Sequence, residues 1–336
     1  MLTQLRLHHF RNYESATFHF APGLNRIAGP NGIGKTNILE ALSLLSTGRS
    51  FRSHSVRDLI TFGEASCHIE ATFLRDGATQ RLSLSYLDGR RQMRHNDAPL
   101  TTHADLLGLF PSIIAAPSDI DLIHGSPSLR RRFLNIHIAQ KSRHYAFHLL
   151  RYTQALKQRN TLLKQRSLED IEVWEKEMLI SALFIMEARK EAIEELTPLV
   201  AERASHLSGE PFTITYAPSL REGKTFEKSR ERDMQLGATS IGPHRDELLF
   251  MIDGKEMRLI ASEGQKRTAL TALRLAQLDH APEGTLLCID DFAAHLDETR
   301  RGRLFDEVAP FDQVVMTAPL REERCDIAEI AIGDGK

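Results

Sequence analysis

Residues 29–36 read GPNGIGKT and decide the fold, because they match the phosphate-loop pattern G-x-x-x-x-G-K-[ST]. The three glycines let the backbone wrap closely and point its N–H groups at phosphate oxygens. A short apolar run over residues 24–28 precedes the loop, and apolar residues at helical spacing follow it over 38–45. The order of strand, loop and helix start predicts a nucleotide-binding site, although a ligand-free turn that merely uses three glycines remains the alternative.

The loop supplies the first set of candidate site residues. Lys35 is predicted to reach the β- and γ-phosphates, and the Thr36 hydroxyl is predicted to join the shell of a Mg²⁺ ion. ATP and Mg²⁺ are therefore the expected cofactors. The predicted phosphate-binding residues are Gly29, Pro30, Asn31, Gly32, Ile33, Gly34, Lys35 and Thr36.

A second candidate half of the site lies far downstream. Residues 285–291 read TLLCIDD, an apolar run that ends in two carboxylates, as a Walker B strand does. Asp290 is predicted to hold Mg²⁺ through its water shell, and Asp291 to orient or deprotonate the attacking water. Many buried strands end in aspartate, so this pattern indicates a nucleotide site only in combination with the phosphate loop. The predicted catalytic residues are Lys35, Asp290 and Asp291.

The number of residues between the two motifs distinguishes one class of phosphate-loop protein from another. Lys35 and Asp290 are 255 positions apart, whereas small GTPases and simple kinases place the motifs much closer, and the chain has no NKxD base-reading motif. The spacing fits ATPases in which a helical arm is inserted between the motifs, as in SMC proteins. Here the insertion has room only for a short arm.

Composition excludes several other classes of protein. The 336 residues are 41% hydrophobic and 26% charged, which predicts a folded core. Three cysteines far apart in sequence offer neither a disulfide framework nor a clustered metal site. No apolar run approaches the ~18 residues of a membrane span, and the first residues do not resemble a signal peptide. These features predict a soluble cytoplasmic protein.

The chain is expected to form two lobes. Residues 1–115 show strand-like alternation with an antiparallel meander, residues 126–207 have few helix breakers, and α/β character then returns. We predict an ATPase lobe I from residues 1–115 plus 280–336, and a helical lobe II from residues 116–279. Lobe II would carry a hairpin arm over about 126–207, with its second helix from roughly 171 to 207.

Charge within the predicted arm is uneven. Residues 122–168 contain ten Lys or Arg and no acid, whereas residues 169–203 contain ten acids and four bases. The two helices could neutralise each other along their shared flank. The cations could also form a surface for nucleic-acid phosphates. The sequence leaves both possibilities open.

Further segments resemble the motifs of one family in order along nearly the whole chain. Residues 5–13, LRLHHFRNY, resemble the opening of SMC-like repair ATPases. The segments that resemble successive motifs of the RecF family are TGRSFR at 47–52, PSDIDLIHG at 117–125, GSPSLRRRFLN at 125–135, TSIGPHRDEL at 239–248 and ASEGQKRTAL at 261–270.

The resemblance implies an α/β, ABC-type ATPase head, with a mixed sheet and flanking helices, whose two copies close face to face around ATP. The segment around Ser262 and Gly264 matches the signature motif, which caps the γ-phosphate of the opposite subunit. Ser262 could instead simply cap the following helix, with Gln265 as its capping-box partner. The resemblance adds five predicted nucleotide-binding residues: Ser262, Gly264, Asp297, Arg11 and Asn12.

Two segments depart from the family pattern. Lys266 follows Gln265 where a second glutamine is usual. Residues 293–297 read AAHLD instead of the common SELD, so that Asp297 is kept but the serine and glutamate are missing. Asp291 stands where most ABC transporters have glutamate, and its shorter reach is consistent with slow hydrolysis. Altered turnover and altered communication between subunits are expected.

The resemblance also implies binding to duplex DNA and to single-strand/double-strand junctions, and assistance to recombinase loading with RecO and RecR. Because the chain has no groove-reading motif, we expect sequence-independent contacts to phosphates. The DNA-contact candidates are Arg49, Arg52, Arg57, Arg130, Arg131 and Lys141. For Arg130 to Arg132, local pairing with Asp119 and Asp121 is the rival explanation.

The predicted function is that of an ATP-dependent DNA-binding protein of recombinational repair and replication-fork maintenance. ATP would drive homodimerisation on DNA, and weak, DNA-stimulated hydrolysis would release the dimer. Two alternatives remain: a nucleotide-binding subunit of an ABC transporter, and a scaffold that binds nucleotide without hydrolysing it.

Overall fold

The chain folds into two units in the computed structural model, which describes all residues except 54, 211, 292–297, 319–327 and 333–336. Unit 1 comprises Met1–Asp119, His206–Ser208 and Leu270–Lys336, and unit 2 comprises Ile120–Ser205 and Gly209–Ala269. Compared with the predicted lobe I, unit 1 also takes residues 116–119, 206–208 and 270–279. The physical reason is visible in helix α9 (Glu263–Asp279), whose second half belongs to unit 1: Arg274 donates to both carboxylate oxygens of Asp119, at 2.9 and 2.5 Å.

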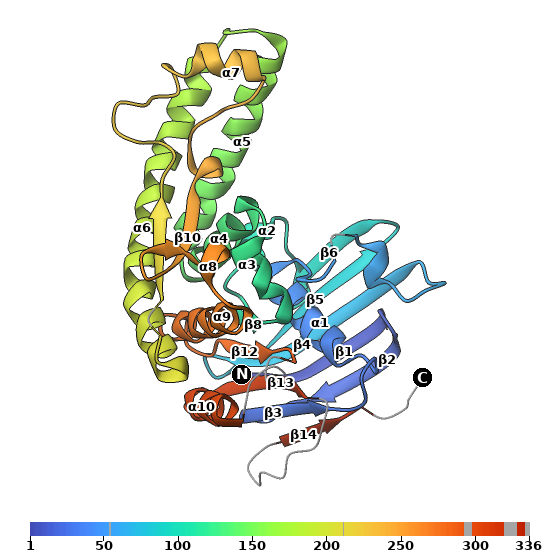
Figure 1. Cartoon of the computed structure of the whole chain (residues 1–336). Coiled ribbons are helices and arrows are strands. Elements are labelled where there is room, and N and C mark those ends of the chain that lie inside the picture. The colour runs from blue at the N-terminus through green and yellow to red at the C-terminus, as the bar shows by residue number, and fades with distance from the viewer. Residues whose placement is uncertain (54, 211, 292–297, 319–327, 333–336) are drawn as a thin grey trace. The chain divides into compact units, whose positions relative to one another are not determined.

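The first sheet of unit 1 is antiparallel and contains the predicted meander (Figure 1). The hairpin turns that follow β4 (Ser66–Arg75) and β5 (Ala78–Leu87) use Asp76-Gly77 and Asp88-Gly89. Both residues of each turn have positive φ, as this Asp-Gly pattern predicts from the sequence. Alternate residues Leu82, Leu84 and Tyr86 point into the core. The strands, in sheet order, are β2 (Tyr13–His19), β1 (Leu2–Phe10), β4 (Ser66–Arg75), β5 (Ala78–Leu87), β6 (Arg90–His95) and β7 (Ala98–Pro99).

The second sheet of unit 1 is parallel and positions the site. Its order is β14 (Ala328–Ala331), β3 (Gly23–Ala28), β13 (Gln313–Ala318), β12 (Leu286–Ile289) and β8 (Ser112–Ala115). Every neighbouring pair is parallel, so that the carboxyl ends of β3 and β12 lie at the same edge with only β13 between them. All four residues of β12 are buried, as expected of a strand covered on both faces.

Helix α1 (Lys35–Thr47) supplies much of the core of unit 1. Ile38, Leu39, Leu42 and Leu45 are fully buried and belong to the cluster that includes residues of both sheets. The apolar residues at helical spacing in the sequence therefore form the face of α1 that packs into the core. The shorter elements of unit 1 are η1 (Arg57–Leu59), α2 (His103–Leu106), η2 (Pro117–Ile120) and α10 (Glu298–Val308).

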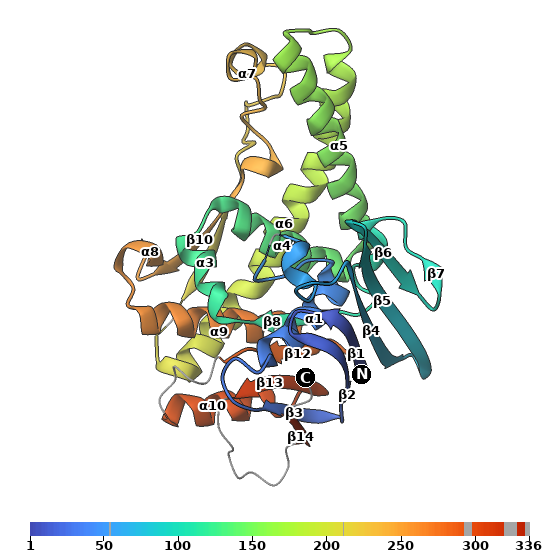
Figure 2. The ribbon, with the colours of Figure 1, turned by 90° about the vertical axis from the view of Figure 1, so that its right-hand side faces the viewer.

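Unit 2 is mainly helical, and its long helices α5 (Arg143–Gln165) and α6 (Ile171–Ser208) lie side by side (Figures 1 and 2). The first limb of the arm is not one helix: α4 (Pro127–Lys141) ends at Ser142, which has extended backbone and whose hydroxyl accepts the N–H of Tyr145 to cap α5. The other elements are α3 (Asp121–His124), β9 (Thr213–Ala217), α7 (Arg230–Leu236), η3 (Pro243–Arg245), β10 (Glu247–Ile252), β11 (Lys255–Glu256) and α8 (Met257–Ile260).

Ion pairs join α6 to the basic helices of unit 2. Lys141 pairs with Glu195 at 3.3 Å, and Arg159, which is fully buried, contacts Glu175 at 3.1 Å. Arg151 pairs with Glu177. The arm's uneven charge is thus partly neutralised between its own helices, as the first possibility proposed. Among the described helices, none is both long and apolar enough to span a bilayer.

Candidate functional site

The phosphate loop connects β3 to α1 at the carboxyl edge of the parallel sheet. Gly34 precedes the helix with φ of 115°, and a Cβ at this position would lie 2.7 to 2.8 Å from the side chains of Asn12 and Tyr13. Only glycine fits this close approach. No side chain of the described part of the chain caps the first turn of α1, so no side chain competes with an anion for the N–H groups at the positive end of the helix dipole.

Lys35 is held inside this loop. Its Nζ donates to the carbonyl oxygens of Gly29 at 2.6 Å and Pro30 at 3.0 Å, and the residue is only 8% exposed. No carboxylate among the described residues forms an ion pair with it. A desolvated ammonium held only by carbonyl dipoles is well suited to pair with a phosphate oxygen.

The downstream aspartate meets the loop directly. The Thr36 hydroxyl donates to Asp290 Oδ1 at 2.8 Å, and the Thr317 hydroxyl donates to the same oxygen at 2.9 Å. The backbone N–H of Asp290 donates to Ala115 O at 2.8 Å, which fixes the residue at the end of β12. Two motifs 254 positions apart, measured from Thr36, therefore share one hydrogen-bonded cluster.

The environment of Asp290 fits a hard divalent cation. The residue is 5% exposed, and burial raises the pKa of its carboxyl. A nearby cation would offset this desolvation of the charged form. Oxygen donors are those that Mg²⁺ prefers, and Mg²⁺ commonly takes one or two protein ligands together with substrate phosphates. The described residues contain no group of three or more His, Cys, Asp or Glu that could hold a metal ion.

Asp291 leaves the strand in a left-handed conformation, with φ of 44°. Its N–H donates to Thr317 Oγ1 at 2.9 Å, so Thr317 holds both consecutive aspartates. Aspartate tolerates this backbone region better than most residues. The turn ends the strand at the position where the predicted catalytic carboxylate stands.

Arg11 and Asn12 contact the loop and its helix from the β1–β2 turn. Asn12 Nδ2 donates to Ile33 O at 2.7 Å, and Asn12 Oδ1 accepts from Asn37 Nδ2 at 2.7 Å. Arg11 donates to both carboxylate oxygens of Glu40, at 2.8 and 2.5 Å. Asn12 thus contacts the phosphate loop and α1, and Arg11 contacts Glu40 of α1; both stay predicted nucleotide contacts.

Glu40 is a site residue that the motifs did not reveal. It is fully buried in α1, where it accepts from Arg11 and from the Ser50 hydroxyl at 2.5 Å, and Arg52 Nη1 lies 4.0 Å away. The available signal was a single acid inside the apolar run of residues 38–45. A buried acid of this kind needs a partner, but the sequence does not say which.

The signature segment begins helix α9 in unit 2. Ser262 Oγ accepts the N–H of Gln265 at 3.2 Å, and Gln265 Oε1 accepts the N–H of Ser262 at 2.7 Å. The alternative capping box is therefore present. Ser262 and Gly264 are also exposed, so the cap leaves both accessible to a ligand.

Lys266, one of the two departures from the family pattern, has an internal partner. Its Nζ lies 3.0 Å from Glu263 Oε1, and this ammonium holds the pKa of the Glu263 carboxyl below its usual value. The departure from glutamine thus adds an ion pair in the first turn of α9. The predicted nucleotide contact Asp297, together with residues 293–296, lies outside the described residues.

The Arg130 side chain is buried inside unit 2 and hydrogen-bonded there. It is 5% exposed and donates to both carboxylate oxygens of Glu247, at 2.7 and 3.0 Å, and to the carbonyls of Leu122 and Gly125. We therefore remove it from the DNA-contact candidates, since its donors are already used. For Arg130, the rival pairing with Asp119 or Asp121 is not observed, because its carboxylate partner is Glu247, 117 positions away.

The remaining DNA-contact candidates differ in accessibility. Arg131 is half-buried and donates to Asp246 O at 2.9 Å, and burial lowers its pKa. Lys141 is paired to α6. Arg49, Arg52 and Arg57 are exposed, which is the condition for contacting a phosphate.

Strand β6 offers further exposed cations that motif analysis did not single out. Arg90 and Arg94 are exposed on the face opposite the buried Met93. The sequence signal was the run RRQMRH at 90–95, in which period-2 alternation separates these two arginines from the core side.

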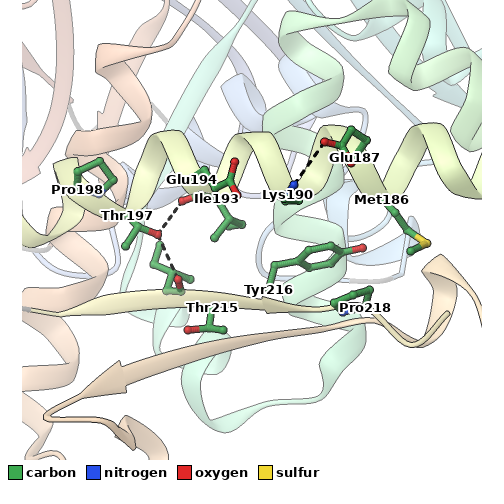
Figure 3. A pocket seen from close by; sticks show the side chains of 11 residues that line it. Met186, Glu187, Lys190, Ile193, Glu194, Thr197, Pro198, Thr215, Tyr216 and Pro218 are labelled. Atoms are coloured by element: carbon green, nitrogen blue, oxygen red, sulfur yellow. Dashed lines mark hydrogen bonds and ion pairs between the residues drawn. The ribbon is translucent and has the colours of Figure 1, made fainter. Parts of the chain in front are cut away.

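Unit 2 also contains a hollow of about 610 Å³ between α6 and β9 (Figure 3). Its cation Lys190 lies 3.7 Å from Glu187 Oε1, and Glu194 adds a second acid. This charge balance does not suit a triphosphate. The lining is completed by Met186, Ile193, Thr197, Pro198, Ile214, Thr215, Tyr216 and Pro218.

Comparison with known proteins gives the family. Residues 1–330 match the model described as the RecF/RecN/SMC N terminal domain. A protein of Protochlamydia amoebophila named "DNA replication and repair protein RecF" is 40% identical over 94% of this chain and 93% of its own length. A Chlamydia caviae protein of the same name is 35% identical over 94% of this chain and 91% of its own. The chain belongs to the RecF family.

Solved structures agree with this assignment. The structure titled "recombination mediator protein RecF-ATP in RecFOR pathway" is 28% identical, with a TM-score of 0.90 over 98% of this chain and 97% of that one. An Smc head domain from Pyrococcus furiosus, at 21% identity and a TM-score of 0.58, shares the fold. The predicted ABC-type ATPase head fold is confirmed.

Proposed function

We propose that this chain is an ATP-dependent DNA-binding protein of recombinational repair and replication-fork maintenance. The observation that carries the proposal is the Thr36–Asp290 hydrogen bond, which unites a phosphate loop with a buried carboxylate at one sheet edge. The relatives named for DNA replication and repair, and the neighbour titled as RecF with ATP, support the nucleotide and the pathway.

Nucleotide binding would use groups already in place. Lys35 would exchange its two loop carbonyls for β- and γ-phosphate oxygens, a stronger charge-assisted interaction. Thr36 and Asp290 would hold Mg²⁺, whose contribution is to neutralise developing charge on the phosphates. Asp291 would orient the attacking water.

Dimer closure would complete the site. The exposed Ser262 and Gly264, at the start of α9, would offer a hydroxyl and helix N–H groups to the γ-phosphate bound by a second copy. ATP would then favour the dimer, and loss of the γ-phosphate would release it. Hydrolysis would be weak, because the Asp291 side chain is shorter than that of a glutamate. DNA binding would stimulate it.

DNA contacts would be made to the phosphate backbone, through Arg49, Arg52 and Arg57, with Arg131 and Lys141 in secondary roles. This arrangement would favour duplexes and strand junctions without regard to sequence. RecO- and RecR-like proteins would be the partners in recombinase loading, in line with the pathway named for the solved neighbours.

The test is ATP turnover with and without duplex DNA, alongside direct ATP binding. The proposal expects slow turnover that duplex DNA increases. Retained ATP binding with no turnover under either condition would favour a non-hydrolysing scaffold. Turnover indifferent to DNA would contradict the proposed role, and the transporter alternative is already disfavoured by membership of the RecF family.

A further inference from the structure

One tyrosine of unit 1 carries a buried hydroxyl group without a hydrogen-bond partner. Tyr13 is the first residue of β2, is 6% exposed and belongs to the hydrophobic core cluster. Its ring packs edge-on against Phe18, with the ring centroids 5.6 Å apart. No group of the described residues forms a hydrogen bond with Tyr13 Oη. Since an unpaired buried hydroxyl destabilises a folded protein, packing alone would favour phenylalanine at this position.

The Tyr13 hydroxyl lies against the phosphate loop. A Cβ placed on Gly34 would be 2.8 Å from Tyr13 Oη, so the hydroxyl is next to the backbone of the last glycine before Lys35. Gly34 has φ of 115° and precedes the first turn of α1, which none of the described side chains caps. The hydroxyl is therefore close to the positive end of the helix dipole, where an anion is stabilised.

The neighbouring Asn12 lies against the same glycine and has partners at both ends of its amide. Its Nδ2 donates to Ile33 O at 2.7 Å, and its Oδ1 accepts from Asn37 Nδ2 at 2.7 Å. The Tyr13 hydroxyl, at the same place, has neither kind of partner in the described part of the chain. The contacts beneath the loop therefore leave one buried donor unused.

The chemistry of this donor suits a phosphate oxygen. Burial raises the pKa of the Tyr13 hydroxyl, so the group stays protonated and donates without carrying a charge of its own. A hydrogen bond to a charged acceptor is stronger than one between neutral groups. Because Oη is buried beneath the loop, a macromolecular partner cannot reach it, whereas a phosphate bound inside the loop lies on the other side of the same backbone.

The position of the hydroxyl along the loop indicates which phosphate it would contact. The Lys35 ammonium lies at the far end of the loop, where it donates to Gly29 O and Pro30 O. In phosphate loops the lysine reaches the β- and γ-phosphates, and the backbone N–H groups cradle the α- and β-phosphates. The Gly34 end of the loop, where the hydroxyl lies, therefore corresponds to the α- and β-phosphates.

We propose that the Tyr13 hydroxyl is a further donor of the nucleotide site and that it donates to an α- or β-phosphate oxygen of the bound nucleotide. The loop covers the hydroxyl, so this contact requires the loop to move, and the release of Lys35 from its two carbonyls frees the loop to do so. Glycine at position 34 is needed because any side chain would fill the space next to Oη. The inference rests on the proposed nucleotide binding and adds to it a residue outside the loop motif.

The test compares Tyr13→Phe, which removes only the hydroxyl, with Tyr145→Phe as the matched control. The Tyr145 hydroxyl is also buried, but it donates to Asn135 Oδ1 at 2.7 Å and accepts from Arg189 Nε at 3.2 Å. Urea unfolding of the full-length proteins without nucleotide is measured first. Tyr13→Phe should unfold at the same urea concentration as the wild type or at a higher one. Tyr145→Phe should unfold at a lower one, because only this variant loses hydrogen bonds.

Nucleotide binding should give the opposite ranking of the two variants. In titrations with fluorescently labelled ATP and ADP, Tyr13→Phe should bind both about 10- to 100-fold more weakly than the wild type, because the lost hydrogen bond is to a charged oxygen that both nucleotides share. Tyr145→Phe should bind both as the wild type does. A merely structural role of the Tyr13 hydroxyl would not weaken nucleotide binding while leaving the stability intact.

Unchanged affinities of Tyr13→Phe for ATP and ADP would overturn the inference. A loss of stability in Tyr13→Phe as large as that in Tyr145→Phe would also overturn it, because the hydroxyl would then already have a partner, such as a buried water, before nucleotide binds. A loss of affinity confined to ATP would contradict the contact to the α- or β-phosphate. Failure of the wild type to bind either nucleotide would instead contradict the proposed function itself.

Discussion

Replacing Asp290 by asparagine separates the charge of this residue from its hydrogen bonds. Asp290 Oδ1 accepts from the hydroxyls of Thr36 and Thr317, and an asparagine Oδ1 can accept both bonds. Changing each bond from charged to neutral costs about 1 kcal/mol, so about 2 kcal/mol in all. Removal of a buried charge whose pKa is raised by desolvation offsets part of that cost. The variant should therefore fold, with a free energy of unfolding within about 2 kcal/mol of the wild type.

Alanine at the same position supplies the matched comparison. Asp290→Ala leaves the hydroxyls of Thr36 and Thr317 without this acceptor, at about 1–3 kcal/mol each, so it should destabilise the protein more than asparagine does. Urea unfolding of the ligand-free proteins measures both changes. In the same preparations, Asp290→Asn should bind ATP without Mg²⁺ as tightly as the wild type does, but Mg²⁺ should not increase its ATP affinity. The variant should also hydrolyse ATP poorly and accumulate as the ATP-bound dimer.

The pH dependence of stability has a defined sign. Because the folded-state pKa of Asp290 is raised above its unfolded value, the folded protein binds more protons in the window between the two pKa values. This residue's destabilising effect is thus complete above the folded pKa and is relieved as the pH falls below it. Asp290→Asn should remove that contribution, which a pH series of urea unfolding would reveal. Normal Mg²⁺-dependent turnover in Asp290→Asn, or an asparagine variant less stable than the alanine one, would refute the reasoning.

Three other predictions concern ATP, the dimer and DNA. Lys35→Ala should abolish ATP binding in a fluorescent-nucleotide titration, because it removes the loop's ammonium, and undiminished affinity would count against the assigned phosphate site. Ser262→Arg should keep ATP binding by the monomer but block closure, so that sizing chromatography with ATP shows no dimer; a dimer of normal stability would exclude the role across subunits. If about 4–6 phosphates are neutralised, log affinity for duplex should fall with log salt at a slope of about −4 to −5, and a salt-insensitive interaction would reject phosphate contacts.

The parts of the structure that were predictable from sequence are those set by local pattern. The GPNGIGKT loop, the helix after it and the Asp-Gly turns all appear where spacing and glycine chemistry require them. The meeting of Thr36 with Asp290 was also predictable, because parallel strands deliver their carboxyl ends to one edge. Each of these inferences depends on a local sequence motif or on the periodic spacing of apolar residues.

The partners of buried charges were not predictable in the same way. Arg130 follows Asp119 and Asp121 by eleven and nine positions in sequence, yet it pairs with Glu247, which β10 brings to α4. Glu40 of α1 holds Arg11 of the β1–β2 turn. Such pairs depend on which elements pack together, and the sequence pattern constrains that packing only weakly. The sequence pattern does not predict the end of α4 at Ser142, because a single serine among helix-forming residues is compatible with a continuous helix. Only the structure shows that the Ser142 hydroxyl caps α5.

The most direct test of the account is a crystal structure of the protein with a slowly hydrolysed ATP analogue and Mn²⁺ in place of Mg²⁺, located by its anomalous signal. The account predicts the metal about 2 Å from the Thr36 hydroxyl oxygen, with Asp290 as a ligand directly or through one water, and Lys35 on the γ-phosphate. A metal or triphosphate bound away from Thr36 and Asp290 would contradict it.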